Sequence, residues 1–349
     1  MSLTKSHLRL LTATALIFLA SLPWTWSLFY HRGKRILVDV YSGHDQSIPY
    51  TAAIIYLASV RRSAEMVRSL TLVAQNLHTG PRQWPIILFH TGDFDHAGPR
   101  SELLARLETS LSKVPDTAGS ALQSVFISRI YFSKVHWSLP EGIPDNVTLV
   151  DPVQAGSWPG YHHMCAFFAA NIFSHPALEG YTYYLRLDTD SFIEAPLCYD
   201  PFEVMHVRKR IYGYRAVGPD APDATLGMWE FVDGYARSHP DIEKRLQMNG
   251  WKWPDGRDTL QKGARGLLSY YNNFEIVKLE AFRRPDVHRW LNELMRDPKR
   301  VYKYRWGDAP IRYATVNMFF NATQDTEFFC GMKYTHQFRL GDECTCVPL

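Results

Sequence analysis

Three apolar runs with the composition of buried strands mark the first half of the chain. They cover 51–60, 84–90 and 182–187 and read TAAIIYLASV, WPIILFH and TYYLRL. Between the first two lies 61–77, in which apolar residues recur at the three- and four-residue spacing of a helix. A strand, a helix and a second strand in this order predict a βαβ unit with a parallel sheet.

The remaining sequence continues this alternation. A helix is predicted at 101–111, with Ser101 as its N-cap, and a strand at 124–132. Helical patterns also cover three later segments, 161–178, 224–240 and 308–320. We therefore predict one continuous α/β domain over 51–349, with a central, mostly parallel sheet flanked by helices.

The N-terminus has a different pattern. Residues 10–30 carry no charge, and a helix of that length spans about 30 Å, the thickness of a bilayer core. Two tryptophans and a tyrosine gather at one end, as aromatic residues do at a membrane interface. We expect a transmembrane signal anchor at 10–30, a cytoplasmic tail at 1–9 and a stem at 31–50. A cleaved signal peptide is the stronger alternative and a buried core helix the weaker one.

Two glycosylation sequons favour a lumenal body. They begin at Asn146 and Asn321, and both follow the apolar segment. This order fits a short cytoplasmic tail and a lumenal domain. In an oxidising lumen, one or two disulfides would form among the five cysteines, with one thiol left over.

Composition argues against a nucleic-acid-binding protein and against a cysteine zinc site. The 38 basic and 35 acidic residues leave a net charge of +3. This balance does not suit the clustered basic face of a nucleic-acid-binding protein, so we expect no nucleic-acid partner. No two cysteines have the spacing of a zinc site.

An acidic trio, Asp188-Thr189-Asp190, follows directly after the apolar run 182–187. In open α/β sheets, ligands bind beyond the carboxyl ends of the strands. Two carboxylates this close repel one another unless a cation lies between them or water screens them. Oxygen ligands suit Mn²⁺ or Mg²⁺, and such an ion would neutralise the departing diphosphate of a nucleotide sugar. The alternative is a solvated turn, in which aspartate is common.

The residues around this trio resemble a known family. The chain contains HMCAF at 163–167, YYLRLDTD at 183–190 and CYDPFEVM at 198–205. YNNFEI and RWGDAP follow at 271–276 and 305–310, and VRRS precedes them all at Val60 to Ser63. In order and spacing these segments are similar to motifs of the fungal glycolipid/glycoprotein α-1,2-mannosyltransferases, glycosyltransferase family 15, over roughly 51–340.

This resemblance implies a fold, a donor and a cofactor. The fold would be a GT-A-type nucleotide-sugar-binding fold. The donor would be GDP-mannose, the cofactor Mn²⁺, and the acceptor a mannose hydroxyl of a glycoprotein or glycolipid glycan. Transfer would retain the α configuration.

The resemblance also assigns roles to individual residues. Asp188 stands where the family has a metal-binding glutamate, and Asp190 matches the aspartate of the same motif. His336 matches a metal-binding histidine, and an imidazole ligand favours Mn²⁺ over Mg²⁺. Glu275 stands at the position of the proposed nucleophile, facing the anomeric carbon of the donor.

Two further residues match donor-site positions of the family, Arg61 and Asp308, and Asp190 is expected to contribute to the same site. Arg61 could pair with a phosphate or with the donor base, while its neighbour Arg62 is the solvated alternative. Asp308 could equally cap the helix that follows it, without any ligand.

Three departures from the family pattern leave alternatives open. Aspartate replaces glutamate at Asp188, and Ala166 and Phe168 stand where the family has an arginine and a tyrosine. We expect a single-pass type II Golgi membrane protein whose lumenal domain is a retaining α-1,2-mannosyltransferase. The alternatives are a glycosyltransferase with a different nucleotide-sugar donor and a catalytically silent glycan-binding relative.

Overall fold

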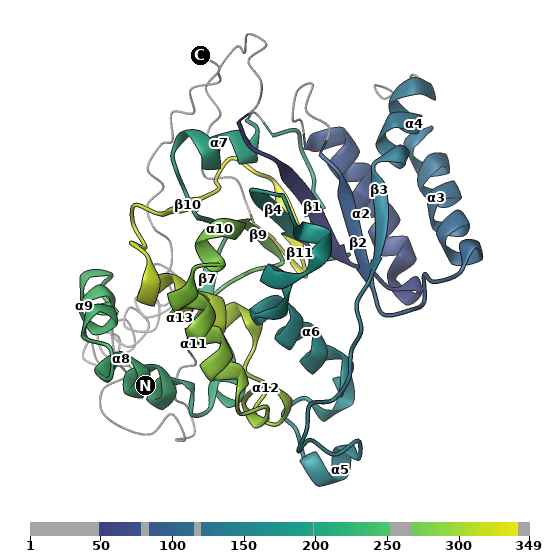
Figure 1. Ribbon diagram of the computed structural model, residues 1–349. Coiled ribbons are helices and arrows are strands. Elements are labelled where there is room, and N and C mark those ends of the chain that lie inside the picture. Colours follow the sequence, from purple (N-terminus) through teal and green to yellow (C-terminus); the bar gives the residue numbers. More distant parts are fainter. Residues whose placement is uncertain (1–48, 78–83, 115–119, 198, 252–266, 341–349) are drawn as a thin grey trace, which may run out of the picture. The chain divides into compact units, whose positions relative to one another are not determined.

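A mixed sheet of seven strands organises the described chain (Figure 1). The computed structural model describes residues 49–77, 84–114, 120–197, 199–251 and 267–340, which all belong to the compact unit Leu37–Leu349. The strands are β1 (Ala52–Leu57), β2 (Ile86–His90), β3 (Ile130–Lys134), β4 (Tyr183–Leu187), β6 (Tyr212–Tyr214), β9 (Phe274–Lys278) and β10 (Thr326–Phe328). Their order is β10-β6-β9-β4-β1-β2-β3. Strands β3, β2, β1 and β4 run parallel, whereas β9 is antiparallel to β4 and to β6.

Helices cover both faces of this sheet (Figure 1). The α-helices that the structure describes are α2 (Ser63–Asn76), α3 (Ala97–Leu111), α4 (Ser120–Ser128), α5 (Val147–Val150), α6 (Gly160–Ala169), α7 (Pro201–Val207), α8 (Met228–Arg237), α9 (Pro240–Met248), α10 (Leu279–Phe282), α11 (Pro285–Met295), α12 (Lys299–Tyr302) and α13 (Asp308–Phe319). Successive side chains of a strand point to opposite faces, so each strand contributes to two hydrophobic cores. In β1, Ala53 and Ile55 join the core that contains α6, α11 and α13, while Ile54 and Tyr56 join the core that contains α2 and α3.

A smaller sheet begins where β4 ends. It consists of β5 (Phe192–Ile193), β11 (Tyr334–His336) and β12 (Phe338–Leu340), in the order β12-β11-β5. Strand β11 runs antiparallel to β5, with Thr335 opposite Phe192. This pairing brings a segment from late in the chain to the carboxyl end of β4. Two further short strands, β7 (Val217–Pro219) and β8 (Leu268–Tyr270), pair with each other.

The predicted α/β class with a mostly parallel sheet is confirmed, with two corrections. Strand β4, predicted as a central parallel strand, has parallel β1 on one side and antiparallel β9 on the other. The segment 124–132, predicted as one strand, is the end of α4 followed by β3. Phe126 and Ile130 are both buried, and their four-residue spacing suits a helix as well as a strand.

Three helix boundaries also differ from the prediction. Helix α3 begins four residues before Ser101, so Ser101 is not its cap. Helix α6 ends at Ala169, and the predicted remainder forms two short 3₁₀ turns, the second of which begins with Pro176. Helix α8 begins only at Met228 because Gly227 before it has a left-handed backbone, with φ of 75°.

The predicted cytoplasmic tail, the membrane anchor at 10–30 and most of the stem lie outside the described residues and stay predictions. Among the helices that the structure describes, none is both long and apolar enough to cross a bilayer. Of the cysteines with a described side chain, Cys330 is disulfide-bonded and Cys165 is a buried free thiol.

Gly213 in β6 is packed too closely to accept a larger residue. A Cβ there would lie 2.5 Å from the Phe329 ring, 3.1 Å from Met205 Sδ and 3.3 Å from Ile276 Cβ. We expect Gly213→Ala to lower the free energy of unfolding by about 1–3 kcal/mol in urea denaturation, as overpacking does. Gly218→Ala is the control, because a Cβ there meets no described neighbour within 4 Å. Equal stability of the two variants would contradict this expectation.

Candidate metal centre

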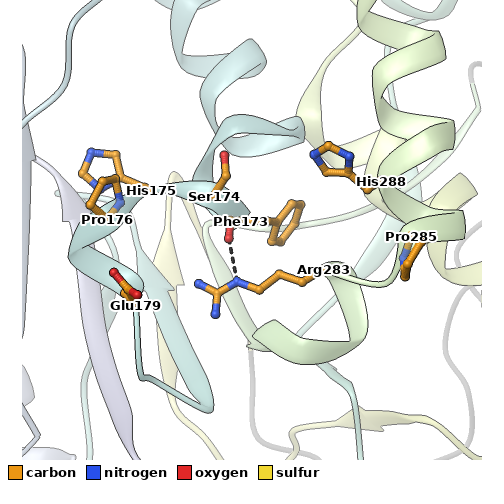
Figure 2. Close-up of a pocket in the computed structure, with 8 residues that line it drawn as sticks. All are labelled: Phe173, Ser174, His175, Pro176, Glu179, Arg283, Pro285 and His288. Carbon is orange, nitrogen blue, oxygen red and sulfur yellow. Dashed lines mark hydrogen bonds between the residues drawn. The ribbon is translucent and has the colours of Figure 1, made fainter.

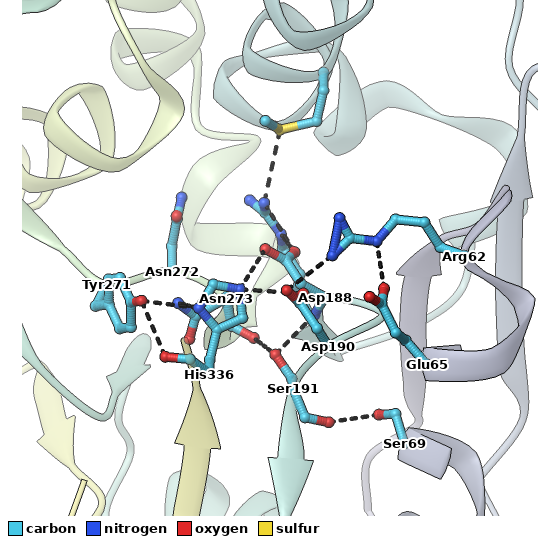
Figure 3. A network of polar contacts seen from close by, with 12 residues as sticks. Arg62, Glu65, Ser69, Asp188, Asp190, Ser191, Tyr271, Asn272, Asn273 and His336 are labelled. Atoms are coloured by element: carbon cyan, nitrogen blue, oxygen red, sulfur yellow. Dashed lines mark hydrogen bonds and ion pairs between the residues drawn. The ribbon is translucent and has the colours of Figure 1, made fainter. Parts of the chain in front are cut away.

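Two strand ends bring together the three predicted metal ligands (Figure 3). Asp188 and Asp190 lie in the turn after β4, and His336 is the last residue of β11. The turn is held by Ser191, whose backbone N–H donates to the Asp188 carbonyl and whose hydroxyl donates to the Asn273 carbonyl. One potential ligand atom from each of the three predicted ligands lies within 4.8 Å of the other two.

The donor set fits a divalent cation of the Mn²⁺ type. His336 Nε2 lies 3.2 Å from Asp190 Oδ1 and 3.8 Å from Asp188 Oδ2. On the other side of the ring, Nδ1 lies 2.8 Å from the hydroxyl of Tyr271, which fixes the orientation of the imidazole. Carboxylate oxygens together with one imidazole nitrogen suit Mn²⁺ better than Mg²⁺. A hydrogen bond from His336 holds the pKa of the Asp190 carboxyl well below its usual range.

A buried arginine orients one of the two carboxylates. Arg186, in β4, donates from Nε and Nη2 to Asp188 Oδ1, over 3.3 and 3.2 Å, and from Nη1 to Asp308. Its guanidinium lies 3.6 Å from the centroid of the Phe168 ring. Burial disfavours the charged form, but Asp188 and Asp308 outweigh it and raise the pKa of Arg186 above its usual value. Sequence analysis missed Arg186, although a single arginine inside an apolar strand is itself a signal of a buried partner.

The two consecutive arginines after β1 are both exposed, but they differ in their contacts. Arg62, expected to be solvated, donates from Nη2 to Asp190 Oδ2 over 2.9 Å and from Nε to Glu65. Arg61, expected in the donor site, is also exposed, and its side chain forms no hydrogen bond or ion pair with a residue that the structure describes. The sequence signal that could have indicated a paired Arg62 is Glu65, which lies one helical turn after it. The donor-site role of Arg61 stays a prediction.

One alternative predicted that Asp308 caps the helix that follows it, and this alternative is wrong. The N-cap of α13 is Gly307, and no side chain caps the helix. The Asp308 carboxylate is instead buried and accepts hydrogen bonds from Arg186 and, over 2.8 Å, from Asn272. The structure therefore joins Asp308 to Asp188 through Arg186.

Glu275 lies opposite Arg186 in the β4–β9 pairing, on the face covered by α6 and α13. It has no exposed surface. One carboxylate oxygen accepts from the hydroxyl of Tyr184 over 2.9 Å, and the other from Nε of Arg312 over 3.1 Å. Both oxygens therefore have protein partners, and the role of Glu275 as nucleophile stays a prediction.

A surface pocket of about 590 Å³ is lined by residues that precede β4 and by residues that follow β9 (Figure 2). Glu179, in its lining, precedes β4, whereas Asp188 follows that strand. The guanidinium of Arg283 donates to the carbonyls of Phe173 and Leu178 over 2.7 and 2.9 Å, so its role here is to fix the segment before β4. Among the described residues, the one cluster with metal-ligand geometry is that at the carboxyl end of β4, and none of its members lines this pocket.

Two solved structures share this fold. The mannosyltransferase Ktr4p from Saccharomyces cerevisiae, in complex with GDP, matches with a TM-score of 0.71 and 20% identity, covering 92% of this chain and 80% of that chain. Core-mannan synthase A from Aspergillus fumigatus, in its Mn/GDP form, matches with a TM-score of 0.66 and 21% identity, covering 90% and 86%. The likeness confirms a GT-A-like α/β fold.

Sequence comparison extends the similarity beyond the fold. The chain is similar to the probable mannosyltransferase KTR3 of Saccharomyces cerevisiae, with 27% identity over 232 residues that cover 62% of this chain and 56% of that protein. It spans little more than half the length of such curated relatives. Residues 121–346 match the family model described as glycolipid 2-alpha-mannosyltransferase. Since this match covers more than half of the sequence, the chain belongs to the glycolipid 2-alpha-mannosyltransferase family.

Proposed function

We propose that this protein is a retaining α-1,2-mannosyltransferase that uses GDP-mannose as donor and Mn²⁺ as cofactor. The acceptor is a mannose hydroxyl of a glycoprotein or glycolipid glycan. The observation that carries the proposal is the cluster of Asp188, Asp190 and His336 at the carboxyl end of β4. Family membership and the GDP and Mn/GDP forms of the two similar structures support the choice of donor and ion.

In this proposal, Asp188, Asp190 and His336 hold the cation. When bound, the ion neutralises the charge that develops on the departing diphosphate. Arg186 keeps Asp188 oriented, since the guanidinium is buried and bridges Asp188 to Asp308. Tyr271 keeps the imidazole of His336 turned so that Nε2 faces the carboxylates.

Donor contacts extend from this centre toward β1. Arg61 is exposed at the carboxyl end of β1, the neighbour of β4, and is available to a phosphate or to the base. Asp190 contributes a carboxylate to the cation, and Asp308 supports the site through Arg186. Glu275 is the proposed catalytic carboxylate, and a donor sugar reaches it only if its buried surroundings open.

A donor screen of the full-length protein in detergent tests the proposal. Each of GDP-mannose, UDP-galactose and UDP-GlcNAc is offered with methyl α-mannoside, with Mn²⁺ or with EDTA. We expect an α-1,2-linked mannose product from GDP-mannose with Mn²⁺, and at most a trace in EDTA. A preference for a UDP-sugar would support the alternative donor that Ala166 and Phe168 suggest. Transfer unaffected by EDTA would contradict the metal centre.

A further inference from the structure

The two carboxylates of the metal centre are bonded in the same way. Each has one oxygen directed toward His336 Nε2 and the other held by an arginine. For Asp188 the arginine is Arg186. For Asp190 it is Arg62 (Figure 3). The two arginines therefore reduce the negative charge that faces the cation position.

The two arginines differ in freedom to move. The side chain of Arg186 is 3% exposed, makes three charged contacts to two carboxylates and lies over the Phe168 ring. The side chain of Arg62 is 47% exposed, and its carboxylate partners are Asp190 and Glu65. An exposed ion pair contributes little net stability, so the guanidinium of Arg62 can leave Asp190 at small cost.

The charges of the site indicate when the guanidinium of Arg62 would leave Asp190. The charged groups in contact around the centre are Glu65, Asp188, Asp190, Asp308, Arg62 and Arg186. With His336 neutral, as a metal ligand must be, these four carboxylates and two guanidiniums leave two negative charges, which one divalent cation balances. A diphosphate then brings excess negative charge, and an arginine is the side chain best suited to pair with it.

We propose that Arg62 couples cation binding to nucleotide binding. In the empty site its guanidinium neutralises Asp190 and weakens the affinity for the cation. In the loaded site it turns from Asp190 to the diphosphate, which strengthens the binding of both the cation and the diphosphate. This inference rests on the proposed function, because it requires a diphosphate beside the cation. Such coupling is reciprocal: GDP tightens Mn²⁺ binding by the factor by which Mn²⁺ tightens GDP binding.

The test is a Mn²⁺ titration of the full-length protein in detergent, followed by electron paramagnetic resonance, without nucleotide and with saturating GDP. We expect Arg62→Gln to bind Mn²⁺ alone more tightly than the wild type, by about threefold to tenfold. We also expect the factor by which GDP tightens Mn²⁺ binding to fall by at least about fivefold. Arg62→Lys keeps the positive charge, so its affinity for Mn²⁺ alone should stay near that of the wild type.

Arg106→Gln is the matched control, since Arg106 is an exposed helical arginine paired with Glu102 and should leave both titrations unchanged. If Arg62 serves only to orient Asp190, Arg62→Gln will bind Mn²⁺ more weakly with and without GDP, which overturns the inference. Unchanged coupling in Arg62→Gln overturns it as well. Wild-type protein that binds no Mn²⁺ in either condition would overturn the metal centre itself, and with it the proposed function.

Discussion

Asp188→Asn is expected to lower the rate of mannose transfer by at least about 10³-fold. In the proposed function, the cation would supply several kcal/mol of stabilisation to the departing diphosphate, and each 1.36 kcal/mol corresponds to a tenfold change in rate. Two N–H groups of Arg186 donate to Asp188 Oδ1, so the remaining oxygen of an asparagine would turn toward Arg186. The amide nitrogen would then face the cation position, where it cannot act as a ligand.

This loss should be specific to the chemistry. Asp188 is about one-third exposed, and Arg186 keeps its bond to Asp308 in the variant, so we expect a similar melting temperature. The matched control is Asp233→Asn, which removes a carboxylate from the exposed pair with Arg237 on α8. Initial rates with GDP-mannose, measured across a range of Mn²⁺ concentrations, give the comparison. A variant at Asp188 that keeps Mn²⁺-stimulated transfer within tenfold of the wild type would argue against the assigned ligand.

Arg312→Met is expected to destabilise the folded protein by about 3–5 kcal/mol, the usual cost of leaving one partner of a buried ion pair alone. Arg312 and Glu275 both have no exposed surface, and their closest atoms lie 3.1 Å apart. The substitution would also remove the donor that Arg312 gives to the Phe168 carbonyl. Whole domains are stable by only about 5–15 kcal/mol, so this is a large share of the total.

Equilibrium unfolding in urea measures the effect. Arg284→Met is the control, because Arg284 pairs with Asp286 at the surface, where an ion pair is worth at most about 1 kcal/mol. The double variant Arg312→Met/Glu275→Gln should recover part of the loss, since the unpaired buried charge is gone. If the double variant regains stability and still fails to transfer mannose, the Glu275–Arg312 pair is needed for more than folding. Equal stability of Arg312→Met and the wild type would show that the pair is not buried as described.

Local patterns predicted the parts of this protein that depend on local spacing. Apolar runs identified β1, β2 and β4, because strands buried on both faces read as continuous apolar segments. The end of β4 marked Asp188 and Asp190, since carboxylates after such a run have no role in a core. These inferences needed only neighbouring residues.

Long-range contacts could not be predicted in the same way. His336 was reached only through a family resemblance, because nothing near it in sequence shows that β11 pairs with β5. Arg61 and Arg62 lie in the short 3₁₀ turn Val60–Arg62, and the choice between them depends on the direction in which each side chain leaves that turn, which spacing does not determine. Asp308 had the sequence of a helix cap, and only the position of Arg186 on a distant strand shows why it is buried.

The order of the three proposed metal ligands along the chain also bears on when the proposed activity could arise during synthesis. A ribosome-bound chain has completed all seven strands of the large sheet once Phe328 has emerged, but the imidazole arrives only with β11. A nascent polypeptide that ends before β11 would thus contain every strand of the large sheet and still lack one proposed ligand of the cation. If the proposed metal site is correct, sugar transfer would therefore require that β11 has paired with β5.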